Sequence, residues 1–154
     1  MALKEDIRIF RDEEEREELF RIKARQVLDV RSRADVIASD GERIGVLEKV
    51  FRRSLVRSTW RVLGADEAEV AVAEERSVPV AILRRVIDLV PFGELVPIVF
   101  HFTIRSDGQA LGSLVRRWGV RDRYDLDLSA DVERRLDRRL GIALAIALDA
   151  MQGR

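Results

Sequence analysis

Residues 140–151 read Leu-Gly-Ile-Ala-Leu-Ala-Ile-Ala-Leu-Asp-Ala-Met and predict a helix that is apolar on every side. At about 1.5 Å of rise per residue this helix would be about 18 Å long, well short of the roughly 30 Å of hydrocarbon that a transmembrane helix crosses. We therefore expect it to be buried in protein rather than in lipid. A helix that is hydrophobic all round needs apolar neighbours on all sides, and a chain of 154 residues can supply them by wrapping a curved sheet around it.

The residues before the apolar run predict where this helix begins. Ser129 is a candidate N-cap, and Asp131 and Glu133 would place negative charge in the first turn. We therefore expect the helix to span residues 130–152. Asp149 interrupts the apolar run, and because a buried carboxylate needs a partner, we expect it near the mouth of the surrounding sheet.

Composition limits the classes of function. The 28 Lys and Arg residues balance the 28 Asp and Glu residues, so any attraction to nucleic acid or to an anionic membrane must be local. The absence of cysteine excludes thiol catalysis, disulfides and thiolate metal sites. The first 25 residues carry charges throughout and do not resemble a signal peptide. We expect one cytoplasmic domain over residues 1–154.

An internal repeat covers residues 39–62 and 106–128. Each copy begins with Ser-Asp-Gly and has a second glycine four residues after the first. Asp-Gly favours a tight hairpin turn, and the second glycine allows a bulge or a close backbone approach. Each copy therefore predicts a β-hairpin, with a phosphate-binding loop as the weaker alternative. Two pairs of later residues also align: Lys49 with Arg116, and Trp60 with Tyr124.

Alternation of apolar and polar or small residues predicts half-buried strands around residues 20–24, 60–62, 70–72 and 124–128. Residues 13–31 are rich in Glu and Arg, which favour helices, so a helix there is an alternative. Between the two copies of the repeat, residues 80–90 keep helical spacing and predict a short amphipathic connector, and residues 96–104 predict a strand.

The two Asp-Gly hairpins, an Arg-Asp-x-Tyr strand at residues 121–124 and a final Asp-Arg-Arg-Leu-x-x-Ala-Leu-Ala-Ile-Ala-Leu-Asp helix carry a family resemblance. Over about residues 18–152 the chain resembles the LURP-one-related family and its relatives, the phospholipid scramblases and the tubby C-terminal domain. The resemblance implies an α+β, mainly β fold. In that fold a closed antiparallel barrel of about twelve strands surrounds a central hydrophobic C-terminal helix.

Arginines flank both predicted hairpins and alternate with aromatic residues such as Trp60 and Trp118. If each set projects from one face, it would form a groove for phosphate groups, and tubby domains, which the chain resembles, bind phosphoinositides through basic residues on the barrel wall. The residues that we expect to bind an anionic headgroup are Arg52, Arg53, Arg57, Arg116, Arg117 and Arg121. The alternative is a solvated face on which acids such as Glu48, Asp122 and Asp125 balance the arginines.

Four carboxylates precede the last helix, where the resemblance to scramblases makes them weak candidates for calcium: Asp122, Asp125, Asp127 and Asp131. They lack the spacing, the central glycine and the final glutamate of a calcium loop, so strand faces and helix capping explain them better. We predict no metal site and no cofactor. The one histidine, His101, is interpreted as structural, and no hydrolase elbow, Walker loop or zinc-protease helix is present.

These observations favour a non-catalytic barrel that binds anionic phospholipid headgroups or a protein partner at a membrane surface. The protein would then be cytoplasmic or peripheral to the membrane. Scramblase-like lipid transport with calcium is one alternative, although the Cys clusters and the Pro-rich leader of scramblases are missing. Nucleic-acid binding is another, suggested by the arginine and aromatic residues and opposed by the zero net charge. The oligomeric state stays open.

Overall fold

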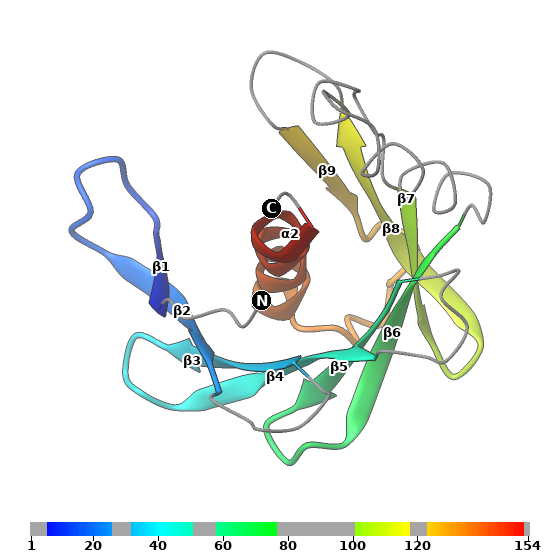
Figure 1. The fold of residues 1–154 in the computed structure, drawn as a ribbon, viewed down its shortest axis with the longest axis horizontal. Coiled ribbons are helices and arrows are strands. Elements are labelled where there is room, and N and C mark those ends of the chain that lie inside the picture. Colours follow the sequence, from blue (N-terminus) through cyan, green and yellow to red (C-terminus); the bar gives the residue numbers. More distant parts are fainter. Residues whose placement is uncertain (1–5, 26–31, 51–57, 77–100, 118–122, 153–154) are drawn as a thin grey trace, which may run out of the picture.

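The computed structural model describes residues 6–25, 32–50, 58–76, 101–117 and 123–152. These residues form one antiparallel sheet of nine strands, in which the strands are neighbours in chain order, and one helix (Figure 1). The strands are β1 (Asp6–Phe10), β2 (Glu18–Ala24), β3 (Ser32–Ala38), β4 (Arg43–Val50), β5 (Thr59–Gly64), β6 (Glu69–Glu75), β7 (His101–Ser106), β8 (Gln109–Arg117) and β9 (Arg123–Asp127), and the helix is α2 (Arg138–Gln152).

The sheet curves around α2, so that one of its faces is the inner face of a cup (Figure 1). This confirms a mainly β fold built on the apolar C-terminal helix. The described sheet is not a closed barrel of about twelve strands, because its first strand, β1, and its last strand, β9, do not pair with each other. The sheet also begins before residue 18, where we expected the core to start, because Ile7 and Ile9 of β1 pack against the core.

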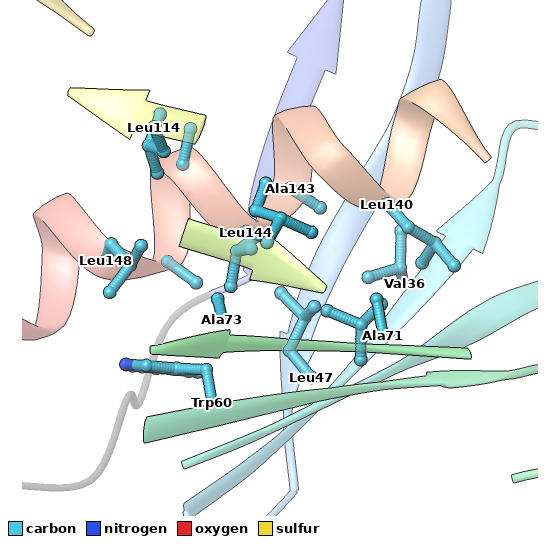
Figure 2. Packing of buried hydrophobic residues seen from close by; sticks show 14 of the residues in the cluster. Val36, Leu47, Trp60, Ala71, Ala73, Leu114, Leu140, Ala143, Leu144 and Leu148 are labelled. Atoms are coloured by element: carbon cyan, nitrogen blue, oxygen red, sulfur yellow. The ribbon is translucent and has the colours of Figure 1, made fainter. Parts of the chain in front are cut away.

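The apolar side chains of the inner face surround α2. Leu140, Ala143, Leu144 and Leu148 of the helix are each at most 3% exposed. Figure 2 shows them facing side chains of β3 to β6 and β8: Val36, Leu47, Trp60, Ala71, Ala73 and Leu114. Several of these positions are alanines, and small side chains let the helix lie close to the strands. Burial of this apolar surface is the main favourable contribution to folding.

The helix begins at Arg138, eight residues later than expected. The carboxylate of Asp137 accepts a hydrogen bond from the Arg139 backbone N–H at 2.8 Å, so Asp137 rather than Ser129 is the N-cap. Arg134 has φ +52°, a left-handed conformation that interrupts a right-handed helix. The residues that were predicted to form the first two turns of the helix instead form turns between β9 and α2.

The hairpin predictions are confirmed at their glycines. Gly41 and Gly108 adopt φ +90° and +77° in the turns between β3 and β4 and between β7 and β8. A Cβ atom on Gly45 would collide with the carbonyl oxygen of Leu63, and one on Gly112 would collide with that of Asp127. The second glycine of each repeat therefore permits a neighbouring strand to approach closely.

The strand prediction for residues 20–24 is also confirmed, because they lie in β2 and not in a helix. The predicted strands around residues 60–62, 70–72 and 124–128 correspond to β5, β6 and β9. The expected helix at residues 80–90 lies outside the described residues, as does the first part of the expected strand at residues 96–104.

The antiparallel order gives the cup two different ends. Short turns at residues 39–42, 65–68 and 107–108 lie at one end, which we call the turn end. The other end, which we call the distal end, holds the strand termini Ala24, Val50, Glu75 and Arg117. The helix α2 runs from the turn end, where Leu140 contacts Gly45, to the distal end, where Ala145 and Ile146 lie beside Tyr124.

Candidate functional site

Two of the six candidate arginines, Arg116 and Arg117, are described, and they lie at the distal end of β8. Arg52, Arg53, Arg57 and Arg121 lie outside the described residues, but the strands that flank them are described. Residues 51–57 connect β4 to β5, and residues 118–122 connect β8 to β9, and both pairs of strand termini lie at the distal end. The strand termini that flank both arginine-bearing segments therefore lie at the same end of the cup.

The two candidate arginines that are described, Arg116 and Arg117, lie on opposite faces of β8. Successive residues of a strand point to opposite faces, and Arg116 follows the inner-face residue Leu114 by two positions. Arg117 lies on the outer face, where its guanidinium forms an ion pair with Asp125. The two side chains therefore do not share one groove, and Arg117 has an acidic neighbour, as the solvated-face alternative predicts.

The repeat pairs a cationic residue in register with an aromatic residue twice on the inner face near the distal end. Lys49 pairs in register with Trp60, and its ammonium lies 5.7 Å from the centre of the Trp60 ring, a distance at which the cation attracts the ring. Arg116 pairs in register with Tyr124 at the equivalent positions of the second copy. The alignment of the two repeats matches Lys49 with Arg116 and Trp60 with Tyr124. Only the register of the sheet shows that these residues lie on one face.

Two buried polar atoms lie at the same end. The indole nitrogen Nε1 of Trp60 and the Oε1 atom of Glu75 have no hydrogen-bond partner among the described residues, and both residues are at most 2% exposed. The other carboxylate oxygen of Glu75 accepts a hydrogen bond from the Ser58 backbone at 3.4 Å. Figure 2 shows the indole nitrogen of Trp60 directed away from Leu47 and Ala71. The indole N–H of Trp60 is a hydrogen-bond donor, and the carboxylate oxygen of Glu75 is an acceptor.

The outer face of the sheet carries an ion-pair network that the sequence did not predict. Glu67, which has φ +64°, accepts hydrogen bonds from Arg25 at 3.1 Å, Arg33 at 3.4 Å and Arg43 at 3.0 Å. The hydrogen bond from Arg25 is the main reason that the pKa of Glu67 lies below its ordinary value. The Arg25 guanidinium also binds both oxygens of Asp35, which raises the pKa of Arg25.

Glu48 extends this network toward β5. It is 1% exposed and lies between Arg33 at 2.5 Å and Arg61 at 3.3 Å. Arg61 also binds Glu69, and the hydrogen bond from its guanidinium to that carboxylate raises the pKa of Arg61. These arginines of the outer face are therefore balanced by acids, and they hold neighbouring strands together.

A groove of about 420 Å³ runs along β6 on the outer face. Its charged lining residues are two arginines and three acids: Arg61, Arg105, Glu69, Glu74 and Asp107. Because acids outnumber arginines, this groove does not favour an anion. The described outer face thus offers no counterpart to the cationic groove that we expected from the sequence.

The candidate calcium ligands have separate roles. Asp122 lies outside the described residues, Asp125 pairs with Arg117, and Asp127 accepts a hydrogen bond from the Ser129 backbone at 2.8 Å, which is the main reason that its pKa is lowered. Among the described residues, no group of three or more His, Asp or Glu side chains is placed to hold a metal ion.

Asp131 is buried and organises the turn before α2. Its carboxylate accepts hydrogen bonds from the backbone N–H groups of Arg135 at 2.8 Å and Leu136 at 3.1 Å, and from the Arg138 guanidinium at 2.9 Å. Burial acts to raise the pKa of Asp131, but the two backbone hydrogen bonds and the charge of Arg138 outweigh burial, so that the pKa is lowered.

No helix in the described part of the chain has the length and apolar character needed to cross a membrane.

The comparisons with known proteins identify the family. No curated protein and no solved structure matched the chain. Residues 1–149 match the family model described as LURP-one-related. Because this match covers nearly all of the 154 residues, the chain belongs to the LURP-one-related family.

Proposed function

We propose that this chain is a non-catalytic binding domain whose distal end binds anionic phospholipid headgroups. One observation carries the proposal: the strands that flank both arginine-bearing segments end at the same end of the cup. On this proposal the repeat contributes arginines from two distant parts of the sequence to a single end of the molecule.

Two cationic side chains of the inner face, those of Lys49 and Arg116, belong to the same end. Connecting segments on a rigid sheet are also a common place for binding residues. Phosphate groups would bind these arginines through charge-assisted hydrogen bonds.

Vesicle flotation tests this proposal. We expect the chain to float with anionic vesicles and not with neutral vesicles, and we expect flotation to fall as salt screens the charges. A distal variant would combine Arg52→Glu, Arg53→Glu and Arg57→Glu. A matched turn-end variant would combine Arg11→Glu, Arg105→Glu and Arg134→Glu, three exposed arginines at the other end. Binding should be lost in the distal variant and kept in the turn-end variant.

Several outcomes would overturn the proposal. Failure to float with any anionic vesicle would remove its basis, and equal loss in both variants would show that the distal end is not the binding surface. Flotation that requires calcium would favour the scramblase-like alternative. Binding to single-stranded nucleic acid in preference to vesicles would favour the nucleic-acid alternative.

A further inference from the structure

Three arginines of the outer face converge on one carboxylate. They are Arg25, which follows β2, Arg33, in β3, and Arg43, the first residue of β4. The side chain of Glu67 accepts a hydrogen bond from each of them, at 3.1, 3.4 and 3.0 Å. A guanidinium presents donors that match carboxylate and phosphate groups alike. A group of three guanidiniums that holds a carboxylate is therefore also suited to a phosphate.

Each arginine has a second partner that does not involve the Glu67 side chain. These second partners are the Asp35 carboxylate for Arg25, the Glu48 carboxylate for Arg33 and the Ala65 backbone oxygen for Arg43. The three guanidiniums would therefore keep their positions if the Glu67 side chain moved away. An anion that replaced it would meet donors that are already arranged, which lowers the cost of binding.

Withdrawal of the Glu67 carboxylate would leave positive charge in excess. The three guanidiniums would then be opposed by the carboxylates of Asp35 and Glu48, and Glu48 also pairs with Arg61. A phosphate monoester carries a charge of about −1.5 to −2 at neutral pH and three acceptor oxygens, whereas a carboxylate has two oxygens. A phosphate group can therefore balance this charge and accept a hydrogen bond from each arginine.

The Glu67 side chain can leave without disturbing the sheet. It is 36% exposed, and that of Arg43 is 40% exposed. Glu67 lies in the turn between β5 and β6 and not in a strand. Rotation about its side-chain bonds, which is fast for residues that are not buried, would carry the carboxylate into solvent and uncover the arginines.

The backbone of Glu67 supports a role for its side chain. The turns before β4 and before β6 share their hydrogen bonds: the Gly41 N–H donates to the Ala38 oxygen and the Glu67 N–H donates to the Gly64 oxygen, both at 3.0 Å. Gly41 and Glu67 hold equivalent positions, at φ +90° and +64°. Glycine is the residue that this left-handed conformation favours. A glutamate at this position is therefore explained by the contacts of its side chain rather than by the turn.

We propose that Arg25, Arg33 and Arg43 form a binding site for a phosphate group, and that Glu67 occupies this site as an internal substitute for the ligand. Glu67 thereby acts as an autoinhibitory contact. A phosphate-bearing ligand binds when it displaces the carboxylate, and the chain discriminates against weaker anions because they do not. This inference concerns the outer face and does not depend on lipid binding at the distal end.

Titration calorimetry with inorganic phosphate, at an ionic strength held constant with sodium chloride, tests the proposal. Glu67→Gly removes the internal carboxylate and places glycine where the equivalent turn has Gly41. If Glu67 fills the site for about nine-tenths of the time or more, its removal lowers the apparent dissociation constant by about tenfold or more. We expect this gain in Glu67→Gly, and we expect further substitution of Arg43→Gln to abolish it.

Glu15→Gly is the matched control. Glu15 is exposed in the turn between β1 and β2 and also has a positive φ, +56°, so this variant makes the same change in charge and the same change in backbone preference. Circular dichroism would verify the fold. If Glu67→Gly did not fold, Glu67→Asn would replace it, because asparagine tolerates the left-handed conformation and is too short to fill the site. Equal phosphate binding by the Glu67 and Glu15 variants, or binding that survives Arg43→Gln, would overturn the proposal.

A second arm distinguishes the two sources of a phosphate group. Glu67→Gly would be combined with the distal variant, Arg52→Glu, Arg53→Glu and Arg57→Glu, and floated with vesicles that contain phosphatidic acid. Flotation of this combined variant, but not of the distal variant alone, would assign the site to a lipid phosphate. Phosphate binding without flotation would assign it to a soluble phosphate ester. Failure of the distal-end proposal would leave both assignments unaffected.

Discussion

Asp131 illustrates how one buried carboxylate changes the local structure. The sequence suggested a residue of the first helical turn or a weak calcium ligand. In the fold its side chain is 1% exposed and binds three donors between β9 and α2. Sequence patterns alone cannot distinguish this role from helix capping, because the donors become adjacent only when Arg134 takes its left-handed conformation.

Replacement of Asp131 by Asn tests this role. The asparagine amide keeps one acceptor oxygen, but its NH₂ group would face the N–H donors that now bind the carboxylate. We therefore expect the free energy of unfolding to fall by about 1–3 kcal/mol. Denaturant unfolding would measure this loss. The control Glu133→Gln alters an exposed acid two residues away and should leave stability nearly unchanged. An equal effect of the two substitutions would contradict the assignment.

The lowered pKa of Asp131 also predicts a pH dependence. A carboxylate whose pKa is lower in the folded than in the unfolded state stabilises the fold fully above the unfolded pKa of about 4. This stabilisation is lost as the pH falls through the lowered folded value. When the pH is lowered below about 4, the free energy of unfolding of Asp131→Asn should therefore fall less than that of the unmodified chain.

At the scale of elements, the burial of α2 could be predicted because its apolar character leaves few alternatives. The hairpins could be predicted because Gly41 and Gly108 occupy turns that need positive φ. The first residue of α2 could not be predicted, because Ser129 and Asp137 are both good N-caps and the choice between them depends on tertiary contacts of Asp131. The ion pairs of Glu67 could not either, because they join residues up to 42 positions apart.

Two neighbouring residues of α2 test its position. Ala143 is fully buried, whereas Ile142 is 41% exposed. We expect Ala143→Asp to lower the free energy of unfolding by roughly 4 kcal/mol or more, since it buries an unpaired charge, and to leave little soluble folded protein. Ile142→Asp should remain soluble and folded. Thermal unfolding of both variants would measure the difference. Near-equal melting temperatures of the two variants would contradict a helix that packs against the sheet at Ala143 and is exposed at Ile142.

At the scale of the whole molecule, the central result is the difference between the two ends of the cup. The sequence contained the arginines, which suggested a groove for phosphate groups, and the repeat, which predicted two hairpins. Strand alternation alone puts the consecutive residues Arg116 and Arg117 on opposite faces, so this could be predicted from a strand assignment. Which side chains of different strands share a surface could not, because register and curvature decide it. The sequence also did not indicate that the outer-face arginines Arg25, Arg33 and Arg61 are engaged by acids.

Hydrogen–deuterium exchange with and without phosphatidylglycerol vesicles would locate the binding surface, because it reports where the chain is protected. The distal-end proposal predicts slower exchange in peptides that contain residues 51–57 and 118–122 when vesicles are present. It predicts unchanged exchange in the turns at residues 39–42, 65–68 and 107–108. Protection confined to those turns, with none at the distal end, would contradict headgroup binding at the distal end.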